Sequence, residues 1–261
     1  NGVAAPITTF TERNKRVNSV YGTATLSYAN KIFLDVTGRN DWSSTLPSGN
    51  NSFFYPSVST SFILSDLLRL PEQISFAKLR ASWAQVGNDT APYKTAKYYN
   101  TSAFPGSASV SSTLYNARFK PEISNSIEVG LDWRMFKQRF GLDLAFYNNI
   151  TRNQILDVPM DQTTGYTKAT MNSGKVRNRG IELQLDGTPV KTKNFTWNST
   201  FTWAKNYNKV LSLAAGLTDG QTIAYTGGTN CALIAKVGGS IGDIYGYKLK
   251  RAPDGQVVWK D

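Results

Sequence analysis

Histidine is absent from the 261 residues of this chain, and cysteine occurs once, at Cys231. Histidine is the commonest general base and the commonest metal ligand in proteins, so its absence removes the usual basis of both kinds of site. A single cysteine excludes an internal disulfide framework and a multi-cysteine metal centre. We therefore expect no catalytic residue, no metal, no cofactor and no enzymatic activity.

Long apolar runs are also missing. The mean hydropathy is −0.34, and no stretch approaches the ~18 apolar residues that a membrane-spanning helix requires. The first residues, NGVAAPITTFTERNKR, have no apolar core of the kind found in a signal peptide. Transmembrane β-barrels lack long apolar runs as well. Hydropathy alone therefore leaves a membrane location open.

The positive charge is not concentrated. The formal net charge is +11, but the nearest approach to a basic cluster is Lys175–Arg179. No RNA-binding signature, basic helix or zinc spacing accompanies it. We expect no nucleic-acid partner.

What the sequence does contain is two-residue alternation. In NFTWNSTFTW, residues 194–203, Phe195, Trp197, Phe201 and Trp203 share one face, and threonine and asparagine occupy the other. Successive side chains of a β-strand point to opposite sides, so the pattern predicts a strand with one aromatic and one polar face. The same alternation predicts eight strands, near 18–29, 31–39, 53–65, 74–86, 125–136, 139–149, 176–187 and 194–206.

The predicted strands are joined by short and long connections in turn, so that all short links fall at one end of the sheet. Between Leu64 and Leu70 there is room for one or two helical turns at most. Outer-membrane barrels have short periplasmic turns, long extracellular loops and alternating strands with aromatic girdles. This pattern favours an antiparallel transmembrane β-barrel, with the aromatic face toward lipid and the polar face toward a hydrated lumen. A secreted carbohydrate-binding β-sandwich is the alternative.

Six short stretches resemble SusC/RagA-type TonB-dependent outer-membrane transporters. They are RNDWS (39–43), FFYPSVS (53–59), AKLRASWAQVGN (77–88), FKPEISNSIEVG (119–130), NRGIEL (178–183) and VGGSIGDIYGY (237–247). The resemblance implies an all-β fold in which about eight strands belong to a larger, 22-stranded barrel. It also implies a plug domain that contacts TonB, a SusD-like surface lipoprotein, and import of an oligosaccharide or a peptide across the outer membrane of a Gram-negative bacterium.

On this interpretation, residues 1–261 form an internal part of the barrel domain, without the plug, the TonB box or the C-terminal strands. A complete eight-stranded barrel, acting as an adhesin or a small porin, remains the alternative. Open sheet edges are prone to aggregate, so we expect the isolated piece to be unstable in solution.

Candidate functional residues are few. Glu182 and Asp186 share a strand face, but four residues along a strand span about 13 Å, too far for a glycosidase pair. We expect them to pair with basic residues of neighbouring strands. We expect the outer loops, especially 87–124 and 207–261, to form the surface that faces the lipoprotein. For contact with a ligand or the lipoprotein we select polar and aromatic residues in the predicted outer loops. These residues are Trp42, Tyr93, Tyr98, Tyr99, Asn100 and Tyr115.

Overall fold

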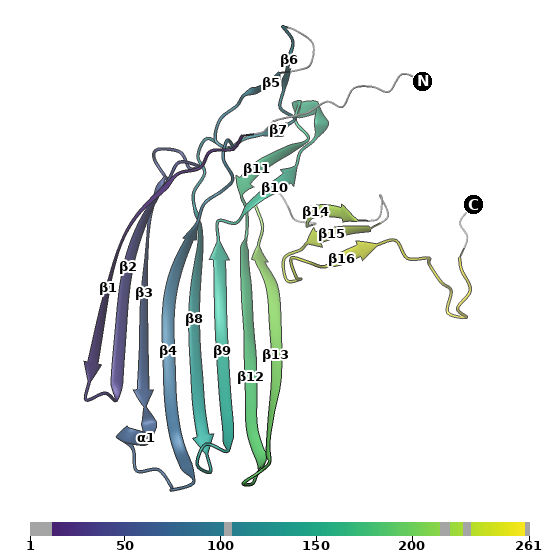
Figure 1. Ribbon diagram of the computed structural model, residues 1–261. Coiled ribbons are helices and arrows are strands. Elements are labelled where there is room, and N and C mark those ends of the chain that lie inside the picture. Colours follow the sequence, from purple (N-terminus) through teal and green to yellow (C-terminus); the bar gives the residue numbers. More distant parts are fainter. Residues whose placement is uncertain (1–11, 102–105, 215–219, 227–230, 259–261) are drawn as a thin grey trace, which may run out of the picture.

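The computed structural model describes residues 12–101, 106–214, 220–226 and 231–258. Its main element is one antiparallel sheet with the strand order β1-β2-β3-β4-β8-β9-β12-β13. The strands lie side by side as a single curved layer (Figure 1). They are β1 (Val17–Tyr28), β2 (Ile32–Ser43), β3 (Ser52–Ile63), β4 (Ile74–Asn88), β8 (Glu122–Met135), β9 (Phe140–Arg152), β12 (Lys175–Lys191) and β13 (Thr196–Ser212).

Smaller elements lie in the connections. Three additional sheets have the orders β10-β11-β7, β14-β15-β16 and β5-β6. Their strands are β5 (Tyr99–Thr101), β6 (Ala108–Val110), β7 (Thr113–Leu114), β10 (Ile155–Pro159), β11 (Lys168–Asn172), β14 (Gln221–Thr226), β15 (Cys231–Ala235) and β16 (Ile244–Gly246). The helices are α1 (Leu64–Leu67) and the 3₁₀ turn η1 (Gln162–Thr164). Over the described ranges, neither has the length and apolar character needed to cross a membrane.

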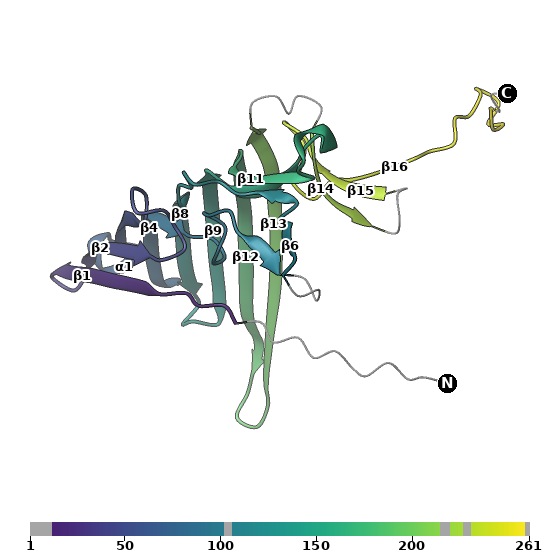
Figure 2. The same cartoon turned by 90° about the horizontal axis from the view of Figure 1, so that it is seen from above.

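The connections are sorted by end, as the sequence predicted. Residues 29–31, 64–73, 136–139 and 192–195 join strands at one end of the sheet, and 44–51, 89–121 and 153–174 join them at the other. All the small sheets lie at this second end, which we call the long-loop end (Figures 1 and 2). One predicted contrast in length was wrong. The link predicted to be short, 66–73, spans 64–73 in the structure and is longer than 44–51, because β3 ends at Ile63 and β2 extends to Ser43.

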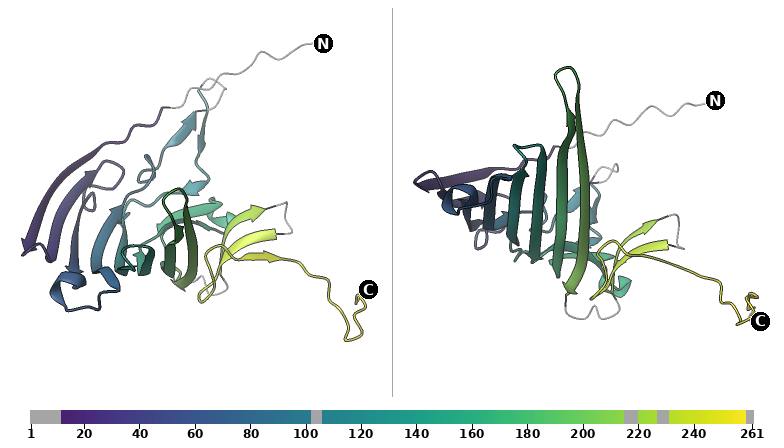
Figure 3. Two further views of the ribbon diagram at one scale, coloured as in Figure 1. Left: turned by 60° about the horizontal axis from the view of Figure 1, so that its bottom comes forward. Right: turned by 90° about the horizontal axis from the view of Figure 1, so that it is seen from below.

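All eight predicted strands of the main sheet are present, with shifted bounds. The largest differences are at the C-terminal ends of β2, which reaches Ser43 where 31–39 was predicted, and of the β12–β13 hairpin, whose strands reach Lys191 and Ser212 where 176–187 and 194–206 were predicted. Figure 3 shows this hairpin extending beyond its neighbours at the turn. The strands within the connections were not predicted, because strands of two to six residues are too short to show a period.

One row of paired residues crosses the whole sheet and contains only hydrophobic side chains. The row is Tyr28, Ile32, Phe62, Leu79, Leu131, Leu144, Leu183 and Trp203, each facing the next across a strand pair. The row one residue along lies on the opposite face and includes Arg80 and Glu182. We call these the apolar face and the polar face. The eight-strand register keeps the alternation in phase across all pairs, which a one-residue slip would destroy.

The apolar face has no protein partner in the described chain. The accessible surface is 18437 Å², whereas a compact protein of this mass exposes about 11,000 Å². Trp203 is 44% exposed and Tyr28 74%. Buried hydrophobic clusters occur instead at the long-loop end, where Leu46, Phe53 and Phe119 pack together. A second cluster joins Val176 and Val210 to Ala235.

We predict that Phe119→Ala loosens the long-loop end. Phe119 is fully buried against Leu46 and Phe53, and removing a buried phenyl ring costs about 3–5 kcal/mol. Hydrogen exchange across 89–121 in the full-length protein should accelerate. Phe136→Ala, at a residue 54% exposed in a turn, is the matched control and should leave exchange unchanged. Equal effects of the two substitutions would contradict this account of the cluster.

Candidate functional site

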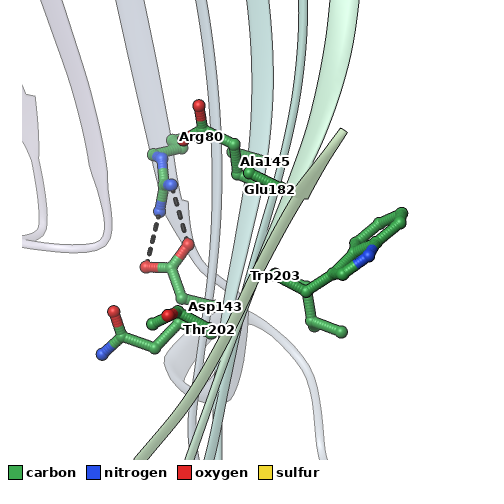
Figure 4. A pocket seen from close by; sticks show the side chains of 9 residues that line it. Arg80, Asp143, Ala145, Glu182, Thr202 and Trp203 are labelled. Atoms are coloured by element: carbon green, nitrogen blue, oxygen red, sulfur yellow. Dashed lines mark hydrogen bonds and ion pairs between the residues drawn. The ribbon is translucent and has the colours of Figure 1, made fainter. Parts of the chain in front are cut away.

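The polar face carries a network of ion pairs at mid-height of the sheet. Arg80 on β4 donates two hydrogen bonds to Asp143 on β9, at 2.9 and 3.3 Å, and its Nε lies 3.9 Å from Glu128. Figure 4 shows Arg80 and Asp143 facing each other on one side of the sheet while Trp203 points to the other. Beside the pair lies a hollow of about 280 Å³ that Glu182, Gln184 and Thr202 also line.

Two glycines allow Arg80 and a second arginine, Arg134 on β8, to reach across an intervening strand. Arg80 pairs in register with Gly130 on β8, and a Cβ at Gly130 would lie 2.4 Å from the Arg80 Nε. Likewise, a Cβ at Gly141 would lie 2.3 Å from an Nη atom of Arg134, which reaches over β9 to Asp186 on β12 at 3.5 Å. Glycine at these two positions therefore leaves the space that each guanidinium occupies, and a larger residue would displace it.

These ion pairs are typical of a hydrated protein surface rather than of a catalytic site. The side chains of Arg80 and Asp143 are 34% and 35% exposed, and pairs with that much contact with water contribute little to stability. The pairing predicted for Asp186 is confirmed by its contact with Arg134. For Glu182, the described residues include no ion-pair partner; it lines the hollow beside Arg80.

A second group of polar side chains lies in the connection 153–174. Asp157 on β10 accepts hydrogen bonds from Lys168 at 2.7 Å and Thr170 at 2.6 Å. Burial raises the pKa of Asp157, but these two donors and the charge of Lys168 outweigh it, so the net shift is downward. The contacts fix β10 against β11. The sequence did not predict these contacts, because the two strands are short and their pairing depends on how the connection 153–174 folds.

Two of the predicted contact residues meet at the long-loop end. The rings of Tyr98 and Tyr115 stack with centroids 5.5 Å apart, and the Tyr98 hydroxyl donates to that of Tyr115 at 3.3 Å. This hydrogen bond raises the pKa of Tyr98 and lowers that of Tyr115, which accepts it. The adjacent Tyr99 on β5 is 73% exposed. All three tyrosines therefore lie in the connection 89–121 at the long-loop end.

The other predicted contact residues lie elsewhere. Tyr93 is 49% exposed, and its hydroxyl accepts a hydrogen bond from the backbone of Asn14. Asn100 belongs to β5, but its side chain falls outside the described part. Trp42 was predicted in a loop and lies in β2 instead, paired with Asn18 and Ser52. Trp42 lies an even number of residues from Ile32, which belongs to the hydrophobic row, so its side chain is on the apolar face. A tryptophan near a strand end on this face suits a membrane interface.

Sequence reasoning missed a cluster on the polar face near the ends of β2 and β3. Arg39 donates to Asp41 at 2.8 Å, and the hydroxyl of Tyr55 donates to the other oxygen of Asp41. Arg39 also lies 5.7 Å from the centre of the Tyr55 ring. Arg39 and Tyr55 lie in predicted strands, but Asp41 lies beyond the predicted strand 31–39. Only the extension of β2 to Ser43 and the strand register bring the three residues together.

We predict that Gly130→Ala breaks the Arg80–Asp143 pair. The added methyl group requires the guanidinium to move, so the variant should resemble Arg80→Gln in thermal stability, with a loss of up to about 1 kcal/mol for such an accessible pair. Melting of the full-length protein measures this. Gly22→Ala is the control, because a Cβ there meets nothing within 4 Å. Additive losses in the Gly130→Ala, Arg80→Gln double variant would contradict the shared cause.

Comparison with known proteins gives matching results at three levels. The family model of the TonB dependent receptor-like β-barrel matches residues 1–259. TonB-dependent receptor P26 of Formosa agariphila is 33% identical over 76% of the chain, and TonB-dependent receptor SusC of Bacteroides thetaiotaomicron is 26% identical over 80%. The alignments cover 21% and 22% of those two proteins, so the chain spans about a fifth of their length.

Solved structures show the same fold. A structure of the RagAB peptide transporter superposes with a TM-score of 0.76 at 23% identity, over 86% of this chain and 25% of that one. The siderophore receptor PirA of Pseudomonas aeruginosa superposes with a TM-score of 0.52 at 15% identity, over 84% and 38%. The sheet is therefore a section of a larger antiparallel barrel, with its apolar face toward lipid, its polar face toward the lumen and its long loops extracellular. The chain belongs to the TonB-dependent receptor β-barrel family and is of the SusC/RagA type.

Proposed function

We propose that this chain forms part of the wall of an importer in the outer membrane of a Gram-negative bacterium, which takes up a nutrient by TonB-dependent transport. The observation that carries the proposal is the division between the two faces. A complete hydrophobic row crosses the strands on one face, and the ion pairs lie on the other. A sheet divided in this way suits lipid on one side and water on the other.

An oligosaccharide is the proposed substrate. Sugars are held by stacking on aromatic rings and by neutral polar groups, and the long-loop end presents the stacked Tyr98 and Tyr115 beside the exposed Tyr99. A peptide is the second candidate, because RagAB, whose fold the chain shares, is described as a peptide transporter. Tyr93 and Asn100 are retained as further proposed contacts with the ligand or with a partner. Trp42, which lies on the apolar face near the long-loop end, is retained as a proposed contact with a partner at the membrane surface.

The proposed partners are a SusD-like surface lipoprotein at the long-loop end and TonB, through a part of the protein outside this chain. The small sheets of the connections gather at the long-loop end (Figure 2) and provide a folded surface there. The proposal of a lipoprotein rests on the resemblance to SusC/RagA-type transporters.

The first experiment uses the full-length protein extracted from outer membranes in mild detergent. Mass spectrometry of the natively purified material identifies what accompanies it. A stoichiometric surface lipoprotein supports an importer that works with a SusD-like lipoprotein. If the protein leaves the membrane without such a partner, even after cross-linking in cells, it is a TonB-dependent receptor without a lipoprotein partner or a non-transporting barrel. Growth of a deletion strain on defined oligosaccharides or peptides then separates the two substrate classes.

We predict opposite tolerances to charge on the two faces of β4. Leu79 lies in the hydrophobic row and Ser82 on the polar face of the same strand. Leu79→Arg should destabilise the barrel by about 2–4 kcal/mol if it lies near the bilayer midplane, whereas Ser82→Arg should be tolerated. The temperature at which the folded band disappears from heat-modifiability gels measures both. Equal tolerance would refute the assignment of the faces.

We predict that Tyr99→Ala weakens uptake or lipoprotein binding if Tyr98, Tyr99 and Tyr115 contact the ligand or the lipoprotein. A tenfold rise in the half-saturating concentration corresponds to about 1.4 kcal/mol, a reasonable size for one exposed ring. Tyr28→Ala is the control, because Tyr28 is 74% exposed against 73% for Tyr99 but lies at the short-turn end. Unchanged transport and unchanged lipoprotein binding in Tyr99→Ala would remove this residue from the site.

A further inference from the structure

Four cationic side chains lie close together on the apolar face of the β12–β13 hairpin, and a fifth, Lys175, shares this face at the start of β12. Arg179 is two residues from Ile181 on β12, and Lys205 is two residues from Trp203 on β13, so each shares a face with its hydrophobic neighbour. The register places Arg177 opposite Lys209. Arg179, Lys205 and Lys209 are exposed and Arg177 is half-buried.

No carboxylate on this face compensates these charges. Every Asp and Glu of the eight strands takes a polar-face position: Asp35, Asp41, Glu122, Glu128, Asp132, Asp143, Glu182 and Asp186. In the described part of the chain, none of the four cations forms an ion pair. Lys205 contacts the ring of Tyr207, 5.1 Å from its centre. Their remaining counter-charge must come from outside the sheet.

The positive charge of this face is concentrated on the hairpin, and outside it the eight strands add one cation, Arg152 on β9, which pairs in register with Lys175. The rows that contain Arg177 and Arg179 continue onto β9 as Ile150 and Asn148, and onto β8 as Asn125 and Ile127. All four are uncharged. The segment that follows β13 packs on the polar face, where Asn208 accepts hydrogen bonds from Ser240 and Ile241. The cations on the opposite face therefore remain uncovered by it.

The position of the cations along the strands matches a leaflet boundary. The hydrophobic stretch of β12 runs from Val190 to Ile181, about 31 Å at 3.4 Å per residue. Tilted by roughly 40°, it covers about 24 Å, close to the ~25 Å apolar band of outer-membrane barrels. Arg179 and Arg177 follow immediately toward the long-loop end, which is extracellular. They therefore lie at the headgroup level of the outer leaflet.

We propose that Arg177, Arg179, Lys205 and Lys209 bind the phosphate of an outer-leaflet lipid headgroup. Beside them lies a groove of about 460 Å³ whose lining includes Phe146, Ile181 and Trp203 as well as Arg179, Lys205 and Tyr207. The apolar residues suit an acyl chain, and guanidinium and ammonium groups suit a phosphate, which arginine can hold by two parallel hydrogen bonds. The inference rests on the proposed outer-membrane location but not on transport.

The test uses the full-length protein purified in detergent and two probes, phosphorylated lipid A and the same lipid A after enzymatic removal of its phosphates. Unmodified protein should bind the phosphorylated probe more tightly. Each basic residue near an anionic surface contributes about fivefold to binding, so the Arg179→Gln, Lys205→Gln double variant should lose on the order of 25-fold. Equal binding of both probes by unmodified protein would overturn the proposal without any variant.

The matched control is Lys191→Gln, Lys193→Gln, which removes the same charge from the other end of the same hairpin. Both lysines are exposed at the short-turn end, and this variant should bind the phosphorylated probe like the unmodified protein. A similar loss in both double variants would show that net charge rather than the site governs binding, and would also overturn the proposal. Heat-modifiability gels verify that each variant is folded, and cell fractionation tests the location separately: protein in the outer membrane that shows no phosphate preference refutes this inference alone.

Discussion

Pairing of the backbone is the constraint on which this structure depends. In lipid, each unpaired amide or carbonyl group costs several kcal/mol, so a membrane sheet must close on itself. Within the sheet, each strand hydrogen-bonds to its neighbours in continuous antiparallel register, but β1 and β13 are edges. Among the described residues, the open edge of β13 has a further backbone partner only at its long-loop end, where Val210 exchanges hydrogen bonds with Gly238 and Gly239. The remaining edge groups need neighbouring strands, which the larger barrel supplies.

The same constraint explains why so little of the chain is buried. A globular protein hides its hydrophobic face against a second layer, whereas here the hydrophobic row faces outward and lipid takes the place of that layer. In the described residues, the buried hydrophobic clusters lie at the long-loop end, around Phe119 and Val210. The charged residues of the polar face remain because the lumen is wet, and their pairing across Gly130 and Gly141 keeps them in contact without a second sheet.

Particular residues show how far sequence reasoning reached. Alternation placed Trp203 and Asp186 on their correct faces, because the side-chain direction of a strand follows from position alone. Trp42 was placed in a loop because the polar residues around it resemble a connection, and only the pairing with Asn18 and Ser52 extended β2 to include it. The stack of Tyr98 on Tyr115 joins residues 17 positions apart within one irregular connection, where no periodicity exists.

The sequence by itself determined the all-β class, the eight strands, the two faces and the sorting of connections by end. All of these depend on two-residue periodicity and on the length of the links, which are local properties. The tertiary structure alone decided which strands pair in which register. It thereby determined that Arg80 meets Asp143 across a glycine, and that four cations gather beside Tyr207 on the lipid side of one hairpin. Contacts between distant segments depend on register, and register is fixed only when all strands pair at once.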